Sequence, residues 1–198
     1  MTCWVVIPAK APPEAKGRLA GALDAASRAG LAEAMLKRAV AAASAANGAT
    51  GMAITGQSLL GLPDTIELLR EPGGGLNTAV TSARTEIALR GGKRIVTLAA
   101  DLPQVVSADV DALCGLPDGV IGIAPDRYGT GTNALSLPLP EALDFTYSYG
   151  PGSCALHKAE ALRLGLEMRL IETPGLARDI DEAADLADAQ DLLTRQEG

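Results

Sequence analysis

Short apolar runs alternate along this chain with longer segments of helical periodicity. The apolar runs predict strands at 4–7, 51–55, 66–69, 95–99, 120–124, 133–137 and 167–171. Apolar residues at helical spacing predict a helix from the N-cap Asp24 to Asn47-Gly48, and further helices at 76–89, 107–113, 153–164 and 182–193. This alternation is typical of an α/β fold with a mainly parallel central sheet and helices on both faces. With no linker or repeat, we expect one domain over residues 1–198.

Composition and charge exclude several classes of partner. The formal net charge is −7, which disfavours binding to nucleic acid or to an anionic membrane. No apolar run approaches the roughly 18 residues of a membrane span. Cys3, Cys114 and Cys154 are scattered and show neither disulfide nor zinc spacing, which favours a reduced, cytoplasmic protein. We expect a monomer or a homodimer.

Three cations follow the first predicted strand, at Lys10, Lys16 and Arg18. Ligands of parallel α/β sheets bind beyond the carboxyl ends of the strands. Three positive charges there suit a triphosphate and its departing pyrophosphate. The alternative is a solvated basic loop.

A glycine-rich loop, Gly73-Gly74-Gly75, precedes the predicted helix at 76–89. Its spacing is not a dinucleotide fingerprint, because Thr78 stands where the last glycine would be. Glycines let backbone approach a ligand, and Asn77 is suited to reading a base edge or a ribose. The alternative is a flexible turn that enters a helix.

Carboxylates also follow predicted strands. Asp101 ends the run at 95–99, and Asp179 and Asp181 lie two residues apart, on one face if that segment is extended. Like charges so placed repel unless a cation lies nearby, and Mg²⁺ prefers carboxylate oxygens. The alternatives are that Asp101 caps a turn or helix and that Asp181 caps the last helix.

A second glycine-rich turn, Gly150-Pro151-Gly152, leads into the predicted helix at 153–164. A helix start with Ser153 at the cap is suited to binding an anion through unpaired backbone N–H groups. The alternative is plain capping. His157, the only histidine, has either a structural hydrogen-bonding role or a place facing the site.

Several short motifs recur in the order known from one enzyme family. They are Ile7-Pro8-Ala9-Lys10, Lys16-Gly17-Arg18-Leu19, Gly75-Leu76-Asn77, Ala100-Asp101-Leu102-Pro103, Ala124-Pro125-Asp126-Arg127, Gly131-Thr132-Asn133-Ala134-Leu135, Tyr149-Gly150-Pro151-Gly152-Ser153, His157, and Pro174-Gly175-Leu176 with Asp179-Ile180-Asp181. Over nearly its whole length the chain resembles the 2-phospho-L-lactate and phosphoenolpyruvate guanylyltransferases. It departs from them at Gly17, often Ser or Thr in the family, and at Glu182-Ala183, often Thr-Pro.

The resemblance implies a nucleotidyltransferase fold of the glycosyltransferase-A-like kind, GTP as donor, Mg²⁺ as metal and a role in deazaflavin coenzyme F(420) biosynthesis. The acceptor would be 2-phospho-L-lactate, phosphoenolpyruvate or 3-phospho-D-glycerate. By motif, Asp101 and Asp181 would hold the metal, with Asp179 as a further candidate. Other expected contacts are with the nucleotide, at Pro8, Ala9, Lys10, Lys16, Gly75, Asn77 and Asp101, and with the acceptor, at Arg127, Thr132, Asn133, Gly150 and Ser153.

The expected chemistry needs little from side chains. An ionised acceptor phosphate attacks the α-phosphorus of GTP without a general base, while Lys10, Lys16, Arg18 and Mg²⁺ position and neutralise the phosphates. One rival is a nucleotidyltransferase of molybdenum-cofactor type, whose first loop usually reads L-A-G-G-x-S-x-R-M-G; this chain has Pro8-Ala9-Lys10-Ala11 there. Another is a catalytically idle nucleotide-binding homologue, which would be expected to lack Asp101 or the second carboxylate.

Overall fold

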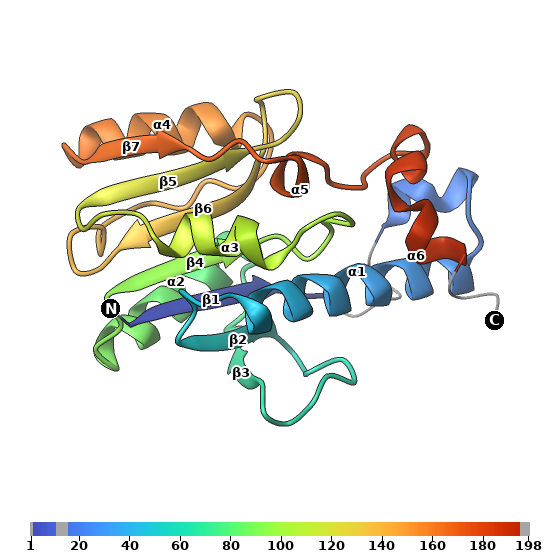
Figure 1. Cartoon of the computed structure of the whole chain (residues 1–198), viewed down its shortest axis with the longest axis horizontal. Coiled ribbons are helices and arrows are strands. Elements are labelled where there is room, and N and C mark those ends of the chain that lie inside the picture. Colours follow the sequence, from blue (N-terminus) through green and yellow to red (C-terminus); the bar gives the residue numbers. More distant parts are fainter. Residues whose placement is uncertain (1, 11–15, 195–198) are drawn as a thin grey trace.

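A seven-stranded sheet forms the centre of the computed structural model, which describes residues 2–10 and 16–194 (Figure 1). The order is β3-β2-β1-β4-β6-β5-β7, and only β6 runs antiparallel to its neighbours, β4 and β5. The mainly parallel sheet is therefore confirmed. The strands are β1 (Cys3–Pro8), β2 (Gly51–Gly56), β3 (Glu67–Arg70), β4 (Arg94–Leu98), β5 (Val120–Pro125), β6 (Thr132–Pro138) and β7 (Glu167–Leu170).

Helices cover both faces of the sheet, as predicted. Along β1, Val5 and Ile7 face one apolar cluster, with residues of α1 (Ala25–Ala45) and α3 (Ser107–Cys114). Val6 faces the opposite cluster, with residues of α2 (Leu76–Leu89) and α4 (Ser153–Arg163). The side chains of a strand alternate between its faces, so a continuous apolar run is what a strand buried on both sides requires. Asp24 caps α1, accepting a 2.7 Å hydrogen bond from the Ser27 amide.

The end of the chain differs from the prediction. The single helix expected at 182–193 is wrong: a 3₁₀ helix, η3 (Ala183–Ala189), precedes the short α6 (Gln190–Thr194). Leu186, Ala189 and Leu192 are spaced by three and join one apolar cluster, which suits the three residues per turn of a 3₁₀ helix. The chain also forms η2 (Gly17–Gly21) and α5 (Pro174–Ala177), which the sequence did not predict.

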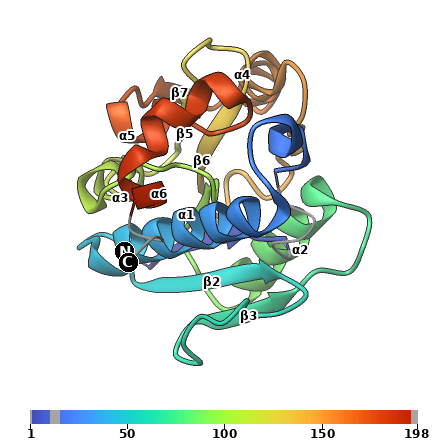
Figure 2. The same cartoon turned by 90° about the vertical axis from the view of Figure 1, so that its right-hand side faces the viewer.

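Segments far apart in sequence meet beyond the carboxyl ends of the parallel strands. There η2, η3 and α6 gather around the first turns of α1 (Figures 1 and 2). Because β6 is antiparallel, its first residues lie at the same edge: the Asn133 carbonyl accepts from the Ala99 amide at 2.9 Å. The Ile180 amide donates to the Asp101 carbonyl at 3.3 Å. This edge therefore collects the residues that follow β1 and β4, those that begin β6, and the segment around Ile180.

Within the described ranges, no helix combines the length and the apolar character that crossing a membrane requires.

Candidate active site

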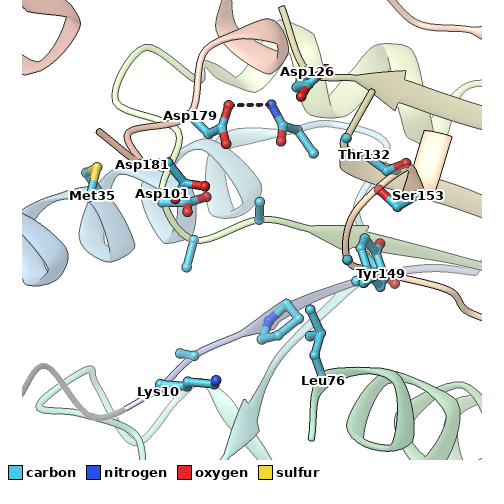
Figure 3. A pocket seen from close by; sticks show the side chains of 18 of the residues that line it. Lys10, Met35, Leu76, Asp101, Asp126, Thr132, Tyr149, Ser153, Asp179 and Asp181 are labelled. Atoms are coloured by element: carbon cyan, nitrogen blue, oxygen red, sulfur yellow. Dashed lines mark hydrogen bonds between the residues drawn. The ribbon is translucent and has the colours of Figure 1, made fainter. Parts of the chain in front are cut away.

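A pocket of about 600 Å³ opens at this edge of the sheet. In Figure 3, Lys10 and Leu76 lie on one side of it, and Asp101, Asp179 and Asp181 lie on the other. Most of the residues predicted for the site line the pocket: Pro8, Ala9, Lys10, Lys16, Arg18, Asp101, Thr132, Asn133, Gly150, Ser153, Asp179 and Asp181.

Lys16 joins two of the predicted metal ligands. Its Nζ lies 2.7 Å from Asp101 Oδ2 and 3.3 Å from Asp181 Oδ1, and it also donates to the Ile180 carbonyl. The Lys16 side chain is only 9% exposed. Burial alone would lower the pKa of Lys16, but the Asp101 and Asp181 carboxylates outweigh it and hold that pKa above its ordinary value. Lys16 is therefore a buried ammonium between two carboxylates.

The backbone of Lys16 is strained. Its φ of 59° and ψ of 35° lie in the left-handed helical region, which residues other than glycine rarely adopt. Such strain costs on the order of 1–3 kcal/mol and persists only where the surroundings enforce it. Here the three contacts of the ammonium do so, and they turn the chain into η2 with Lys16 facing the pocket.

The pair of Asp101 and Asp181 fits a divalent cation. Two carboxylates from separate segments already share one positive charge, that of Lys16. The described residues hold no group of three or more potential metal ligands. Mg²⁺ needs no such cage, since one or two carboxylates with substrate phosphates and water usually hold it.

Asp179 adds negative charge near Asp101 and Asp181 but does not contact Lys16. Burial, and then the charges of Asp101 and Asp181, raise its pKa. Its Oδ1 lies 3.5 Å from the Asn133 amide nitrogen, as the dashed line in Figure 3 shows. Asn133 itself donates mainly to the Leu176 carbonyl, at 2.9 Å, which ties β6 to α5. Asp181, rather than Asp179, is thus the partner of Asp101.

Asp181 does not cap the last helical segment. The Asp185 carboxylate accepts instead from the amides of Asp181 and Glu182, at 2.9 and 2.8 Å. The Asp181 side chain is left to Lys16 and to Arg18, whose Nη1 lies at 3.4 Å. The capping alternative for Asp181 is therefore wrong.

Two further cations, Arg18 and Lys10, line the pocket and are exposed. The Arg18 side chain is 74% exposed and meets Asp181 only at 3.4 Å. Lys10 is exposed at the end of β1 and also lines the pocket. Exposed cations on a pocket wall are suited to binding phosphate oxygens.

The other end of the pocket is formed by the start of α4. Gly152, with φ 72°, is the N-cap, and Ser153 is the first helical residue and makes no capping bond. The expectation that Ser153 is the cap is therefore wrong. Its side chain lines the pocket and donates to no other described residue, although the residue is 2% exposed. The Ser153 hydroxyl is thus available to whatever fills the pocket.

The first amides of α4 are not all free, contrary to the expectation from sequence. The Ser153 amide donates to the Gly150 carbonyl at 3.1 Å, and the Cys154 amide donates to the Thr130 carbonyl at 3.0 Å. Gly150, with φ 135°, adopts a conformation that only glycine takes readily. Hydroxyl groups, more than backbone amides, are therefore the donors at this end.

His157 forms hydrogen bonds with two segments at the α4 end of the pocket. Its Nδ1 lies 3.0 Å from Thr132 Oγ1, and its Nε2 accepts from the Ser148 amide at 3.0 Å. The imidazole is fully buried, and burial lowers the pKa of His157 to about 4, although Glu160 opposes the shift. The histidine is therefore neutral and has the hydrogen-bonding role.

Asn77 and Arg127, two residues predicted to meet a ligand, do not line the pocket and bind other parts of the protein. Asn77 accepts from the Tyr149 amide at 2.8 Å and donates to the Tyr149 carbonyl at 3.2 Å. Arg127 binds Asp185 at 2.8 Å and the Asp179 carbonyl at 3.0 Å. Asn77 fixes the loop before α4, and Arg127 fastens the end of the chain. The structure thus places neither side chain at the pocket, and their contacts with a ligand stay predictions.

Gly75 also lies outside the set of residues that line the pocket. Its φ of 86° continues the positive values of Gly73 and Gly74, and its carbonyl accepts from the Ala79 amide at 3.0 Å. Gly75 therefore starts α2, and the neighbouring Leu76 reaches the pocket instead.

Tyr149 lines the pocket although no role was assigned to it from sequence. Its ring stacks on that of Tyr147 at a centroid distance of 6.0 Å. The clustering of aromatic residues just before the glycine-rich turn was the signal that could have identified it.

Comparisons with known proteins agree with this geometry. The profile of the family described as "Guanylyl transferase CofC like" matches residues 3–192. A phosphoenolpyruvate guanylyltransferase of Rubrobacter xylanophilus is 39% identical, covering 94% of this chain and 93% of its own. One from Conexibacter woesei is 35% identical, covering 100% and 92%. A 2-phospho-L-lactate guanylyltransferase of Halorubrum lacusprofundi is 32% identical, covering 87% and 77%.

Solved structures support the fold. A nucleotidyl transferase from Methanothermobacter thermautotroptrophicus superposes with a TM-score of 0.64 at 17% identity, covering 99% of both chains. CMP:2-keto-3-deoxy-manno-octonic acid synthetase gives a TM-score of 0.63 at 11% identity, covering 99% of this chain and 100% of its own. The nucleotidyltransferase fold expected from the motifs is confirmed, and this chain belongs to the family of CofC-like guanylyl transferases.

Proposed function

We propose that this enzyme transfers GMP from GTP to the phosphate of phosphoenolpyruvate, releasing pyrophosphate, as a step of coenzyme F(420) biosynthesis. The names of the relatives from Rubrobacter and Conexibacter support phosphoenolpyruvate. That of the Halorubrum relative makes 2-phospho-L-lactate the second candidate acceptor.

The observation that carries the proposal is the division of one pocket into two chemically different ends. Lys10, Arg18 and the Lys16–Asp101–Asp181 cluster provide charge for a triphosphate. The hydroxyls of Thr132 and Ser153 stand apart from that cluster, on the side of α4 (Figure 3). A donor and a small anionic acceptor can therefore lie side by side in one cavity, as direct transfer between them requires.

The reaction needs no general base. An oxygen of the acceptor phosphate attacks the α-phosphorus of GTP, the bond from that phosphorus to the β-phosphate oxygen breaks, and pyrophosphate leaves with the electron pair. The protein's part is to align the two phosphates and to offset the charge on the leaving group, which Lys10 and Arg18 do from the pocket wall.

Mg²⁺ completes the donor site in this proposal. Asp101 and Asp181 would hold it, with Asp179 beside them adding negative charge. The ion supplies neutralisation of the phosphate charge during transfer. Lys16, which lines the same pocket, would be a third cation beside the triphosphate.

A panel of substrates tests the proposal. Purified enzyme with Mg²⁺ and GTP is expected to release pyrophosphate with phosphoenolpyruvate, and mass spectrometry should find the guanylylated acid. 2-Phospho-L-lactate and 3-phospho-D-glycerate are compared at equal concentration, and pyruvate, which lacks a phosphate, serves as the control. Absence of pyrophosphate with every phospho-acid would favour the idle homologue. Release with CTP and a molybdenum-cofactor precursor would favour the other rival.

A further inference from the structure

The protonation of His157 is fixed by its neighbours. A backbone amide can only donate, so the Ser148 N–H, at 3.0 Å, requires an unprotonated Nε2. In a neutral imidazole the proton then resides on Nδ1. Nδ1 lies 3.0 Å from Thr132 Oγ1, so the imidazole donates and the threonine oxygen accepts.

The direction of the His157–Thr132 hydrogen bond determines which role is left to the Thr132 hydroxyl. Its oxygen already accepts from His157, and its own proton has no acceptor among the described residues. Thr132 is 8% exposed and lines the pocket. The hydroxyl proton is therefore directed to a group inside the pocket, and that group must be an acceptor.

The surroundings hold the imidazole in this orientation. Its ring packs on Tyr149 at 5.0 Å and on Phe145 at 5.8 Å, between centroids. The loop that carries Ser148 is anchored at both sides: Glu160 accepts from the Thr146 amide at 2.7 Å, and Asn77 binds the Tyr149 backbone. A ring flip would exchange the two nitrogens and break both hydrogen bonds of the imidazole, and a shift of the loop would break the anchoring bonds of Thr146 and Tyr149.

We propose that His157 is a positioning residue that makes the Thr132 hydroxyl an obligate donor, so that the ligand atom it meets must be able to accept a hydrogen bond, here a carboxylate or phosphate oxygen of the acceptor. The inference rests on the proposed function for the identity of that acceptor. It adds a source of selectivity: an acceptor analogue whose carboxylate is replaced by a carboxamide with its NH₂ turned to Thr132 would place two donors against each other.

Nitrogen-15 NMR tests the geometry without any variant, because His157 is the only histidine. Imidazole-labelled protein without a histidine tag is expected to show one ring system, with a protonated Nδ1 and an unprotonated Nε2, at pH 7 and at pH 5.5. A proton on Nε2, or an imidazolium at pH 7, would overturn the proposal. This readout does not depend on catalysis, so it remains decisive even if the proposed reaction fails.

Kinetics test whether His157 acts through Thr132. His157→Phe is expected to raise the KM for phosphoenolpyruvate about tenfold, as loss of one oriented hydrogen bond should, with the KM for GTP unchanged. His157→Asn, whose amide can still donate, should recover part of the loss. The double variant with Thr132→Val should be no worse than Thr132→Val alone. Independent, multiplying effects, or equal increases in both KM values, would refute the positioning role.

Discussion

Replacing Ser153 by alanine separates a binding role from a structural one. Ser153 is 2% exposed and lines the pocket, and its hydroxyl has no partner among the described residues, so removing the hydroxyl orphans no protein group. Loss of a hydrogen bond to a charged ligand costs about 1–3 kcal/mol, which corresponds to a roughly 5- to 150-fold rise in the KM for the phospho-acid. The KM for GTP should stay nearly constant.

The stability of Ser153→Ala sharpens the test. Because Gly152 is the N-cap and Ser153 makes no capping bond, the free energy of unfolding should change by less than about 0.5 kcal/mol. Asp24→Ala is the matched control: it removes a true cap, should cost about 1 kcal/mol and should leave both KM values unchanged. Both KM values and urea unfolding are measured for each variant. A stability loss in Ser153→Ala without an acceptor-specific change in KM would show that Ser153 is a structural residue and does not bind the phospho-acid.

Three further predictions concern the rest of the site. Asp101→Asn and Asp181→Asn should each lower kcat by at least about two orders of magnitude at saturating Mg²⁺, and Asp179→Asn by less; near-normal turnover with an intact circular dichroism spectrum would remove that residue from the metal site. Turnover should be faster with GTP than with ATP or CTP, and equal rates in the pyrophosphate assay would reject the donor assignment. Because the pKa of His157 falls from 6.5 to about 4 on folding, the unfolded chain binds a proton that the folded chain excludes. Stability should therefore decrease as pH drops through this window, by about 3 kcal/mol at pH 4. Urea unfolding of the wild type and of His157→Asn checks this, and an identical pH dependence in the two would contradict it.

The elements with uninterrupted patterns were the ones that the sequence predicted well. The prediction of 76–89 coincides with α2, and each predicted strand overlaps an observed one. For β1, β4 and β5 the reason is burial on both faces, which leaves a largely apolar run, whereas β7 is mostly exposed. The segment at 182–193 failed because its apolar residues, spaced by three, fit both an α-helix and the 3₁₀ helix that forms.

The site was predicted to the extent that it depends on strand ends. Asp101 and Thr132 follow or begin strands whose order places them at one edge, so topology alone brings them together. Asn77 and Arg127 look identical to ligand-binding residues in sequence, yet their partners lie 72 and 58 residues away. The sequence indicates which polar side chains follow the strands, but not which of them form hydrogen bonds or ion pairs within the protein.

Oxygen-18 labelling of the acceptor tests whether the acceptor is joined to GMP with its phosphate intact. The enzyme is incubated with Mg²⁺, unlabelled GTP and phosphoenolpyruvate carrying oxygen-18 in its phosphate, and the masses of the products are measured by mass spectrometry. Attack by the acceptor phosphate on the α-phosphorus predicts a guanylylated acid that retains all of the label and pyrophosphate that carries none. Release of GDP or GMP, with neither pyrophosphate nor a labelled conjugate formed, would contradict guanylyl transfer to the acceptor.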